Sequence, residues 1–450
     1  MKVLHNQFHF KGGAHPPDHK QATAAAALQT LPLPARLTVS MAQHLGAPAK
    51  PCVKPGDRVL SGQLIGTANG FISAAVHAPA AGTVAAIQDA PTSTGRTAPA
   101  ILIDTDASET RRDASYPPIP AWRSQEPKRL VARVAEAGII GMGGAGFPTH
   151  VKLSPPSDKP IDTVILNGAE CEPFLNSDNR LMVEQAASIV EGCEIIRHIL
   201  GAGRICFVIE NNKPQAAAAL YAAIKEAKGN HEIHVVETLY PQGSEKQQIF
   251  TVTGRTVPTG ALPMDVGCVV ENAGTAYAIW DAVANGRPLT HRAITVAGDA
   301  VAAPGNWIAP VGASLADLVA ACGGAKPDLA KVISGGPMMG FALGTLDVPM
   351  GKTSSGLLLF SSALLTSYAT HACINCGRCV EACPMRLMPT ELSQAIEADD
   401  IDEAERCQVM DCFECGACAY ECPARRPLVQ HMRRAKAVIA QRRRAAQPKS

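Results

Sequence analysis

Near its C-terminal end the chain carries the sequence Cys373-Ile-Asn-Cys376-Gly-Arg-Cys379-Val-Glu-Ala-Cys383-Pro384, and it repeats this cysteine spacing at Cys412-Phe-Glu-Cys415-Gly-Ala-Cys418-Ala-Tyr-Glu-Cys422-Pro423. Both copies read Cys-x2-Cys-x2-Cys-x3-Cys-Pro. Three thiolates two residues apart can wrap one iron–sulfur cubane, because the loop turns back on itself and its amides point at the sulfides. The fourth cysteine reaches the other cluster. We therefore predict two [4Fe–4S] clusters with crossed ligation.

Crossed ligation assigns each fourth cysteine to the opposite cluster. Cluster one takes Cys373, Cys376, Cys379 and Cys422, and cluster two takes Cys383, Cys412, Cys415 and Cys418. Zinc is the alternative, but zinc sites favour paired Cys-x2-Cys knuckles and have no use for the third and fourth cysteines or the trailing proline. The 28 residues between the two motifs are rich in helix formers at 391–398 and 402–406, which favours a helical ferredoxin-type domain at 360–430.

The remaining composition limits the class of protein. The chain has 450 residues and 15 cysteines, with 46% hydrophobic and 18% charged residues, so we expect several globular domains rather than a disordered chain. The first 20 residues contain no apolar core typical of a signal peptide, which argues against disulfides. No apolar run approaches the ~20 residues of a membrane helix.

Charge is balanced overall but uneven along the chain. A net charge of +1 gives no reason to expect nucleic acid as a partner. The segment 431–450 is strongly basic and contains no acidic residue. It predicts either an amphipathic helix on anionic lipid or on a partner, or a solvated, frayed tail.

Residues 1–112 begin the domain series with short β segments separated by turns. Asn69-Gly70 predicts a type I′ hairpin between two of them. The pattern resembles the barrel-sandwich fold of lipoyl and biotinyl domains, in which a modified lysine occupies the exposed hairpin. Because residues 68–76 contain no lysine, we expect a structural or docking domain. A Pro-rich linker at 113–127 follows.

Residues 128–288 alternate between helical and strand patterns. Helices are expected at 128–137 and 216–227, and buried strands at 163–166, 204–209 and 233–236. This alternation predicts an α/β domain with a largely parallel sheet. Residues 289–350 then predict a small β-grasp-like domain, from strand, helix and strand patterns at 292–297, 314–321 and 331–334.

A glycine-rich loop follows the first of these helices, with the sequence Gly141-Met-Gly143-Gly144-Ala-Gly146-Phe147-Pro-Thr149. It matches G-x-G-x-x-G, but a helical pattern precedes it where a dinucleotide fold requires a strand. The glycines still permit close backbone approach to a phosphate, and Lys152 adds positive charge. A tight turn that packs helix on sheet is the alternative.

Two further segments strengthen the ligand interpretation. Asn167-Gly-Ala-Glu170-Cys-Glu172-Pro follows the strand at 163–166, at the edge where α/β domains bind ligands. Tyr240-Pro-Gln-Gly243-Ser-Glu245-Lys follows the strand at 233–236. Together with the glycine-rich loop, these segments resemble the flavin- and NADH-binding subunit of respiratory complex I.

The order of all parts resembles one family more closely. Phe10-Lys-Gly-Gly-Ala-His15-Pro-Pro, the lysine-free barrel-sandwich segment, the flavin-site motifs, Gly335-Gly-Pro-Met-Met-Gly340 and the twin cluster motifs are together similar to the RnfC family, which belongs to the Rnf ion-translocating electron transport complex. The resemblance runs from about residue 5 to 430. It implies a multidomain α/β fold with barrel-sandwich, flavin-binding, small β-grasp (SLBB-like) and ferredoxin domains.

The resemblance also implies roles for individual residues. The FMN phosphate and ribityl chain would be held by Gly143, Gly144, Gly146, Lys152, Asn167 and Asn272. Phe147 would stack on the nicotinamide nucleotide and Glu172 would bind its ribose, while Glu170, Gly243 and Glu245 complete the site. At the position of Ala169 the complex I protein has an acidic residue, and at the position of Ser244 it has a glutamate. The residues on the far side of the flavin therefore differ between the two proteins. Each acid has the alternative role of a solvated loop carboxylate.

The implied activity is NADH oxidation without a general base, by a peripheral subunit on the cytoplasmic face of a bacterial inner membrane. Its cofactors would be noncovalent FMN and two [4Fe–4S] clusters, with NAD(H) as substrate. Its partners would be the other Rnf subunits and, through them, ferredoxin and the pumped Na⁺ or H⁺. A soluble donor such as a cobalamin reductase or an amino-acid reductase partner is one alternative, although the cobalamin type lacks the barrel-sandwich domain. A nonenzymatic scaffold is another.

Overall fold

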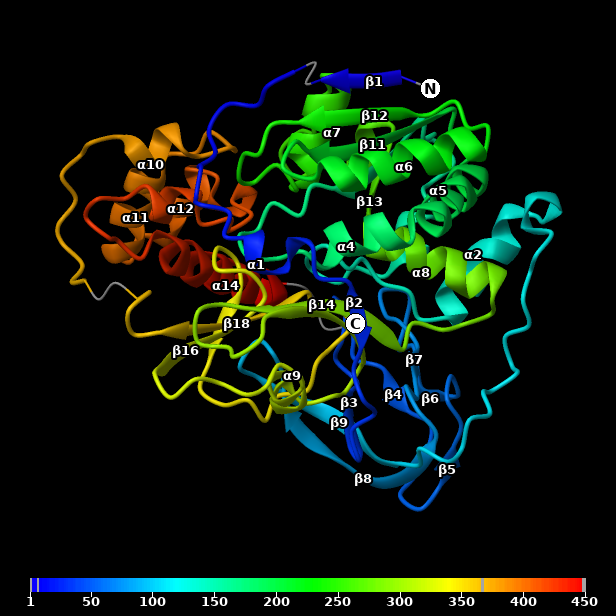
Figure 1. The fold of residues 1–450 in the computed structure, drawn as a ribbon. Helices are drawn as coiled ribbons and strands as arrows, with labels where there is room; N and C mark the ends of the chain where they lie inside the picture. Colours follow the sequence, from blue (N-terminus) through cyan, green and yellow to red (C-terminus); the bar gives the residue numbers. More distant parts are fainter. Residues whose placement is uncertain (1, 6–7, 366–367, 447–450) are drawn as a thin grey trace.

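The structure is a computed structural model, and it describes residues 2–5, 8–365 and 368–446. Four sheets and a helical C-terminal domain make up the fold (Figure 1). The α/β domain occupies one end of the molecule and the barrel-sandwich strands the other, and the β-grasp sheet lies between them. The helical domain stands to one side.

The α/β domain contains a five-stranded parallel sheet in the order β1-β12-β11-β10-β13. Its strands are β1 (Lys2–His5), β10 (Thr163–Gly168), β11 (Arg204–Glu210), β12 (Glu232–Val236) and β13 (Cys268–Asn272). The predicted strands at 163–166, 204–209 and 233–236 are confirmed. Each central strand is a nearly continuous apolar run, as expected for a sheet covered on both faces.

Helices cover both faces of this sheet. They are α2 (Pro127–Glu136), α3 (Thr149–Lys152), α4 (Ser177–Glu184), α5 (Ala186–Leu200), α6 (Pro214–Glu226), α7 (Glu245–Thr253) and α8 (Ala273–Ala284), with short 3-10 turns η1 (Trp122–Ser124) and η2 (Pro263–Val266). The predicted helices at 128–137 and 216–227 correspond to α2 and α6. The expected linker 113–127 is packed rather than free, because Ile119 and Trp122 are buried in the core of this domain.

The β-grasp sheet has six strands in the order β17-β16-β18-β14-β15-β2. They are β2 (Leu28–Thr30), β14 (His291–Ala297), β15 (Gly305–Pro310), β16 (Leu329–Ser334), β17 (Phe341–Leu343) and β18 (Gly356–Ser361), and helix α9 (Leu315–Ala321) packs against them. The sheet therefore reaches beyond the predicted range 289–350. It gains β18 on the C-terminal side and β2 from the N-terminal region.

The barrel-sandwich domain consists of two small antiparallel sheets, β3-β9-β8-β5 and β4-β6-β7. The strands are β3 (Arg36–Ser40), β4 (Lys50–Pro51), β5 (Arg58–Val59), β6 (Leu64–Thr67), β7 (Val76–His77), β8 (Gly82–Pro91) and β9 (Thr97–Thr105). Its apolar side chains form one continuous core with those of the β-grasp sheet. The two predicted domains are thus packed as one body.

The predicted type I′ hairpin at Asn69-Gly70 is wrong. Strands β6 and β7 are joined by the longer loop 68–75, although Gly70 does adopt a positive φ of 98°. Tertiary hydrogen bonds hold this loop open: Ser73 Oγ accepts from the Asn69 amide and donates to Ala47, and the Phe71 carbonyl lies 3.1 Å from His150 Nε2. The loop therefore extends to α3 of the α/β domain.

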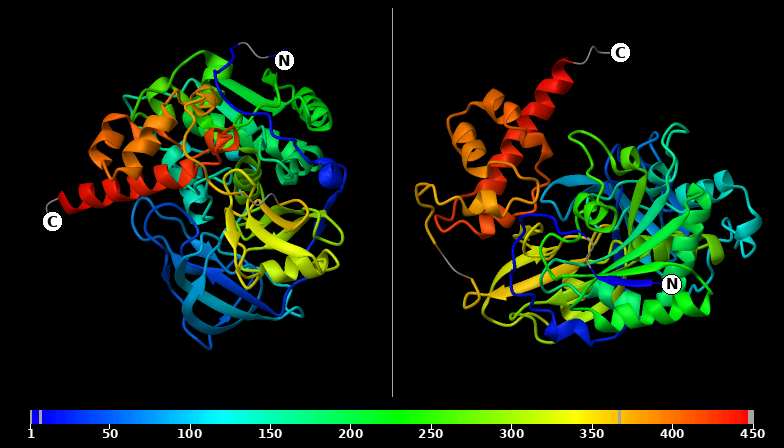
Figure 2. Two further views of the ribbon diagram at one scale, coloured as in Figure 1. Left: turned by 90° about the vertical axis from the view of Figure 1, so that its left-hand side faces the viewer. Right: turned by 90° about the horizontal axis from the view of Figure 1, so that it is seen from above.

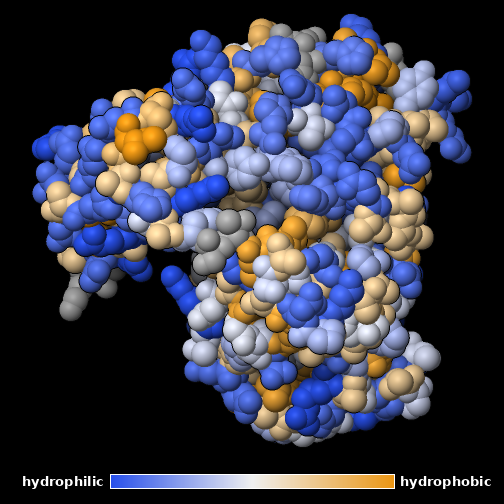
Figure 3. Space-filling model, turned by 60° about the vertical axis from the view of Figure 1, so that its left-hand side comes forward, coloured by the Kyte–Doolittle hydropathy of each residue, from blue (hydrophilic) through white to orange (hydrophobic). Residues whose placement is uncertain are grey.

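The helical domain contains α10 (Arg378–Glu381), α11 (Pro389–Glu397), α12 (Ile401–Arg406), η3 (Val409–Asp411), α13 (Ala417–Tyr420) and α14 (Leu428–Ala446). The predicted helical segments 391–398 and 402–406 correspond to α11 and α12. In the space-filling view of Figure 3 this domain forms a separate lobe, and hydrophilic side chains cover much of it on that face.

The basic segment 431–450 is not a separate tail over the residues described. Helix α14 begins inside the predicted ferredoxin domain, and Met432, Ala435 and Ile439 pack in the core with α11 and α12. On its outer side, Arg442 and Arg443 form ion pairs with Asp402 and Glu405 of α12. The segment is therefore helical rather than frayed up to residue 446, although residues 441–446 are solvent-exposed, while 447–450 lie outside the described residues. Among the described residues, no helix is long and apolar enough to cross a membrane.

Candidate flavin, nucleotide and iron–sulfur sites

The glycine-rich loop projects from the end of α2 and leads into α3. The Gly141 amide donates to the Phe147 carbonyl at 2.8 Å, which closes the loop at its base. Its tip, residues 143–145, is exposed, and a Cβ placed on Gly144 would have no neighbour within 4 Å. Gly146 has a φ of 69°, and a Cβ there would approach Thr353 Cγ2 to 2.7 Å. The tip of the loop is thus an accessible backbone surface, whereas its end at Gly146 is packed against Thr353.

Lys152 lies in the last turn of α3 and points back to the sheet. Its Nζ is 2.8 Å from Glu245 Oε1 and 3.5 Å from Glu271 Oε1, and it also donates to the Val270 carbonyl. The two carboxylates raise the pKa of Lys152 against the effect of its burial. Burial raises the pKa of Glu271 to about 7, although Lys152 opposes this shift. The lysine is therefore a cation held between two acids.

Asn167 and Asn272 end the neighbouring strands β10 and β13 and are paired in register. Asn167 Nδ2 donates to the Gly243 carbonyl at 2.8 Å, and its Oδ1 accepts from Gln248 Nε2 at 2.8 Å. Asn272 Oδ1 caps α8, while its Nδ2 donates to Asp178 at 2.6 Å. The structure thus brings Asn167, Asn272, Gly243 and Lys152 to one edge of the sheet.

Several buried oxygen atoms around this edge lack a hydrogen-bond partner within the described residues. They are Asp178 Oδ1, Gln248 Oε1 and the carboxylate oxygens of Glu271, of which Oε1 has only its ion pair with Lys152 at 3.5 Å. Buried acceptors without partners are costly, and such a group is expected to meet a ligand or water. The hydroxyl groups of a ribityl chain and the N–H of a flavin ring are donors that suit these acceptors. The residues present therefore fit FMN.

Glu170 and Glu172 are both turned toward protein groups. The Glu170 carboxylate accepts from the amides of Asp178 and Asn179 at 2.8 and 3.0 Å, so it caps the start of α4. Glu172 accepts from the amides of Met338 and Met339 at 3.0 and 2.9 Å. Burial raises the pKa of Glu172 to about 7 despite these two amides. Phe147 is half-buried beside the loop tip.

The eight cluster cysteines fall into two groups around the helical domain. Cys383, Cys412, Cys415 and Cys418 line one cavity, together with apolar residues such as Leu387, Phe413 and Met432. This is the ligand set predicted for cluster two, including its crossed member Cys383. Four thiols that line one cavity are the donor set that a [4Fe–4S] cubane requires.

The other four cysteines are Cys379 and three neighbours of its thiol, Cys373, Cys376 and Cys422. Besides burial, Cys422, Cys373 and Cys376 are the groups that raise the Cys379 pKa. Cys422 therefore lies near Cys379 of the first motif, although Cys418 of its own motif packs in the same cluster. Cys376 is exposed whereas Cys415 is buried, so the cluster-one side is the more open to solvent. The ninth cysteine of this region, Cys407, donates to Glu403 at 3.2 Å and lines neither group.

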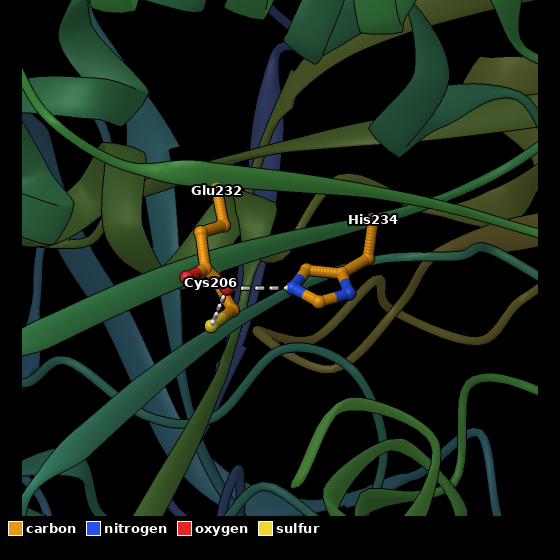
Figure 4. A group of neighbouring side chains, drawn as sticks. All are labelled: Cys206, Glu232 and His234. Atoms are coloured by element: carbon orange, nitrogen blue, oxygen red, sulfur yellow. Dashed lines mark hydrogen bonds and ion pairs between the residues drawn. The ribbon is translucent and has the colours of Figure 1, made fainter. Parts of the chain in front are cut away.

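A separate group of metal-ligand side chains, Cys206, Glu232 and His234, lies on β11 and β12 (Figure 4). One oxygen, Glu232 Oε2, accepts from His234 Nε2 at 3.0 Å, from Cys206 Sγ at 3.7 Å and from Arg204 Nε at 3.0 Å. Arg204 Nη2 is a further donor at 2.5 Å. This arginine already supplies the positive charge that a metal ion would bring, so we interpret the group as structural.

Two residues that contact the candidate sites were not predicted as site residues. Lys20 is buried and its Nζ donates to the carbonyls of Glu170 and Glu172 at 3.0 and 2.9 Å, and to that of Leu175. Tyr240 is 2% exposed, and its hydroxyl donates to the Cys415 carbonyl at 2.6 Å. The Tyr240 motif was visible in the sequence, whereas nothing near Lys20 signalled its position.

Comparison with known proteins agrees with the domain order. Four family models match: an RnfC barrel sandwich hybrid domain at residues 8–108, a Nuo51 FMN-binding domain at 134–281, an SLBB domain at 293–342 and a 4Fe-4S dicluster domain at 366–423. The predicted fold class and its domain order are thereby confirmed. The FMN and cluster interpretations match the two corresponding models.

Relatives match over nearly the whole chain. The C subunit of the proton-translocating ferredoxin:NAD(+) oxidoreductase complex of Clostridium ljungdahlii is 43% identical, over 95% of this chain and 93% of that protein. Its Na(+)-translocating counterpart from Acetobacterium woodii is 41% identical, over 98% and 99%. The C subunit of the ion-translocating oxidoreductase complex of Pseudomonas aeruginosa is 42% identical, over 98% of this chain and 57% of that longer protein.

Solved structures show a similar fold at low identity. An NAD+-reducing [NiFe]-hydrogenase in the H2-reduced state has a chain with a TM-score of 0.50 and 19% identity, over 74% of this chain and 69% of that one. This likeness concerns the fold alone. On the near full-length identity above 40%, the chain belongs to the RnfC family, the C subunits of ion-translocating oxidoreductase complexes.

Proposed function

We propose that this chain is the NADH-oxidising subunit of an ion-translocating ferredoxin:NAD(+) oxidoreductase complex. The full-length relatives that carry this name support the proposal. The observation that carries it is the direct contact between the two predicted cofactor sites. Tyr240, at the flavin-site edge of the α/β sheet, donates its hydroxyl hydrogen bond to Cys415, a cluster-two ligand.

FMN would occupy the edge formed by β10 and β13. Gly143, Gly144 and Gly146 would present the backbone to its phosphate, while Asn167, Gly243 and Asn272 would meet the ribityl chain and ring. Lys152 is flanked by Glu245 and Glu271, so much of its charge is already neutralised. We therefore expect the glycine-rich loop to bind most of the FMN phosphate, and Lys152 to contact polar groups of FMN nearer the flavin ring.

NADH would approach from the open side of the glycine-rich loop. Phe147 is half-buried there and would offer its ring to the nicotinamide nucleotide, while Glu172 would accept hydrogen bonds from the ribose. Glu172 would have to exchange one or both of its bonds from Met338 and Met339 to do so. Glu170 would act indirectly, by capping α4 and fixing the loop.

The flavin that these residues would hold would supply the chemistry that links the two-electron hydride of NADH to clusters that take one electron at a time. The chain's own contribution is to bind and orient the reactants and to exclude water. Cluster two is the group whose cysteines touch the Tyr240 loop, and cluster one is the more exposed. We therefore place cluster two next to the flavin and cluster one at the exit toward partner subunits.

The proposed location is the cytoplasmic face of a bacterial membrane, as a peripheral subunit that contacts the other subunits of the complex and, through them, ferredoxin. The absence of a spanning helix among the described residues is compatible with this place. The coupled ion differs between the relatives, since one is named proton-translocating and another Na(+)-translocating. A soluble flavin and iron–sulfur electron donor is the second candidate.

Anaerobic purification followed by NADH addition tests the proposal. We expect a spectrum with both flavin and iron–sulfur absorbance, and bleaching of the flavin band followed by the cluster band. Flavin-free protein that is inert to NADH would instead support a scaffold. Co-purification with membrane subunits separates a member of the complex from a soluble donor, because only the former is retained with them.

A further inference from the structure

The segment between β1 and α1 (Gln21–Ala24) crosses the boundary between the helical domain and the α/β domain. We call residues 10–20 the strap. In Figure 1 the strap, in blue, descends between the orange helical domain and the green α/β domain, and the second view of Figure 2 also places it between them. This segment contains the Phe10–Pro17 motif, for which the proposed function supplies no role.

Consecutive amides of the strap bind opposite domains. The Gly13 amide donates to the Ala382 carbonyl at 2.9 Å. Ala382 directly precedes Cys383, a cluster-two ligand. The next amide, of Ala14, donates to the Tyr240 carbonyl at 2.8 Å, and the Tyr240 amide returns a bond to Ala14 at 3.0 Å. One peptide step therefore joins the chain next to Cys383, the cluster-two ligand from the first cysteine motif, to the flavin-site loop.

The strap passes so close to both sides that only glycine fits. Gly12 has a φ of 87°, and a Cβ there would lie 2.7 Å from the carbonyl carbon and oxygen of Cys383. Gly13 has a φ of 95°, and its Cβ would lie 2.8 Å from the Tyr240 carbonyl oxygen. Contacts under 3.0 Å with backbone atoms require the neighbouring chain to move.

The far end of the strap holds the remaining flavin-site loop. Lys20 donates to the carbonyls of Glu170 and Glu172, and the Phe174 amide donates to the Asp18 carbonyl at 2.8 Å. Ala14 is 3% exposed, in a small core that it shares with Tyr240, Cys415 and residues of the helical domain. The strap is thus fixed at Gly13 and Ala14 and again at Asp18 and Lys20.

From these contacts we propose that the strap is a positioning element for electron transfer: Gly12 and Gly13 set the separation between the flavin site and cluster two. This inference rests on the proposed function, since it concerns the step between its two cofactor sites. Gly12 and Gly13 are positioning residues, because they touch the ligand-bearing chain and not the reacting groups.

Gly12→Ala and Gly13→Ala test the proposal in the holoprotein. We expect NADH to bleach the flavin band at the wild-type rate, and the later bleaching of the cluster band to slow by roughly 10-fold or more, as misplacement of reacting groups does. The matched control is Gly95→Ala in the β8–β9 turn, which has a φ of 76° and no neighbour within 4 Å. It should behave as wild type in both phases.

A second readout needs no cofactor turnover. Hydrogen exchange of the Gly13, Ala14 and Tyr240 amides should accelerate in Gly12→Ala and stay unchanged in Gly95→Ala. If Gly12→Ala fails to incorporate cluster two, Gly13→Ala gives the kinetic test, because its Cβ would meet Leu239 and the Tyr240 carbonyl rather than the Cys383 backbone.

The outcomes separate the two claims. The positioning role would be overturned if the strap variants showed accelerated hydrogen exchange but bleached the cluster band at the wild-type rate. It would also be overturned if their hydrogen exchange were unchanged. A wild-type protein that binds no flavin would instead overturn the proposed function, and the exchange measurement would still decide whether the strap joins the two domains.

Discussion

A buried lysine at the junction of three domains gives a pH-dependent prediction. Lys352, between β17 and β18, is 1% exposed, and its Nζ donates to the carbonyls of Ala75 and Gly138 at 2.7 and 2.8 Å. Ala75 belongs to the barrel-sandwich domain, and Gly138 shortly precedes the glycine-rich loop. Lys352→Met should therefore loosen the stem of the proposed flavin site as well as the domain junction.

The magnitude follows from the lysine pKa. Burial lowers the pKa of Lys352 from 10.5 to about 7, so at higher pH the unfolded chain binds a proton here that the folded chain does not. Stability contributed by this group therefore rises with pH between about pH 7 and pH 10.5, by up to ~1.4 kcal/mol per pH unit. Integration between about pH 7 and pH 9 gives an increase of about 2 kcal/mol in the free energy of unfolding of the wild type.

The neighbouring histidines do not titrate in this window. Burial, with Lys352 nearby, lowers the pKa of His77 to about 3, and burial also lowers that of His44. Lys352→Met removes the donor of both hydrogen bonds, so the Ala75 and Gly138 carbonyls are left unpaired. Each unpaired buried carbonyl should lower the free energy of unfolding by about 1–3 kcal/mol. The variant should accordingly be more destabilised at the higher pH.

Urea unfolding of wild type and Lys352→Met at the two pH values, followed by tryptophan fluorescence, measures the difference. We expect the destabilisation to be about 2 kcal/mol larger near pH 9 than near pH 7. Lys331→Met, at an exposed position on β16, is the matched control and should show no such change. Equal destabilisation at both pH values would refute the reasoning.

Three further predictions concern the sites themselves. Cys415→Ser should lose cluster two and keep cluster one, so that iron content falls by half; loss of no iron would contradict the ligand assignment. Lys152→Met leaves Glu271 buried without its cation and should weaken FMN binding by about 10-fold, corresponding to ~1.4 kcal/mol, as measured by fluorescence titration; unchanged affinity would remove Lys152 from the site. Glu172→Gln should raise the KM for NADH with little change in kcat. Unaltered steady-state kinetics would limit Glu172 to anchoring the Met338 loop.

The parts of the fold that depend on local spacing could be predicted from the sequence. The cysteine motifs predicted two groups of four thiols, and the structure places one of these groups, Cys383, Cys412, Cys415 and Cys418, around a single cavity. The helical pattern at 128–137 before the glycine-rich loop excluded an ordinary dinucleotide fold, and α2 confirms that helix. The three strands predicted at 163–166, 204–209 and 233–236 are long apolar runs, which leave little choice of structure.

The parts that depend on distant partners could not be predicted. Strand β1 is exposed and short, and it belongs to the α/β sheet only because β12 presents an open edge to it. Strand β2 joins the β-grasp sheet through β15 in the same way. Lys20 and Lys352 resemble surface lysines in the sequence, and their burial depends on backbone carbonyls from other domains.

The most direct test of the central claim is an anaerobic titration of the purified chain with NADH, followed by absorbance and by electron paramagnetic resonance. If the chain connects a flavin to two clusters, each flavin should consume more than one NADH, and cluster signals should grow after the flavin band bleaches. An end point at one NADH per flavin with silent clusters, or no bleaching at all, would contradict the account.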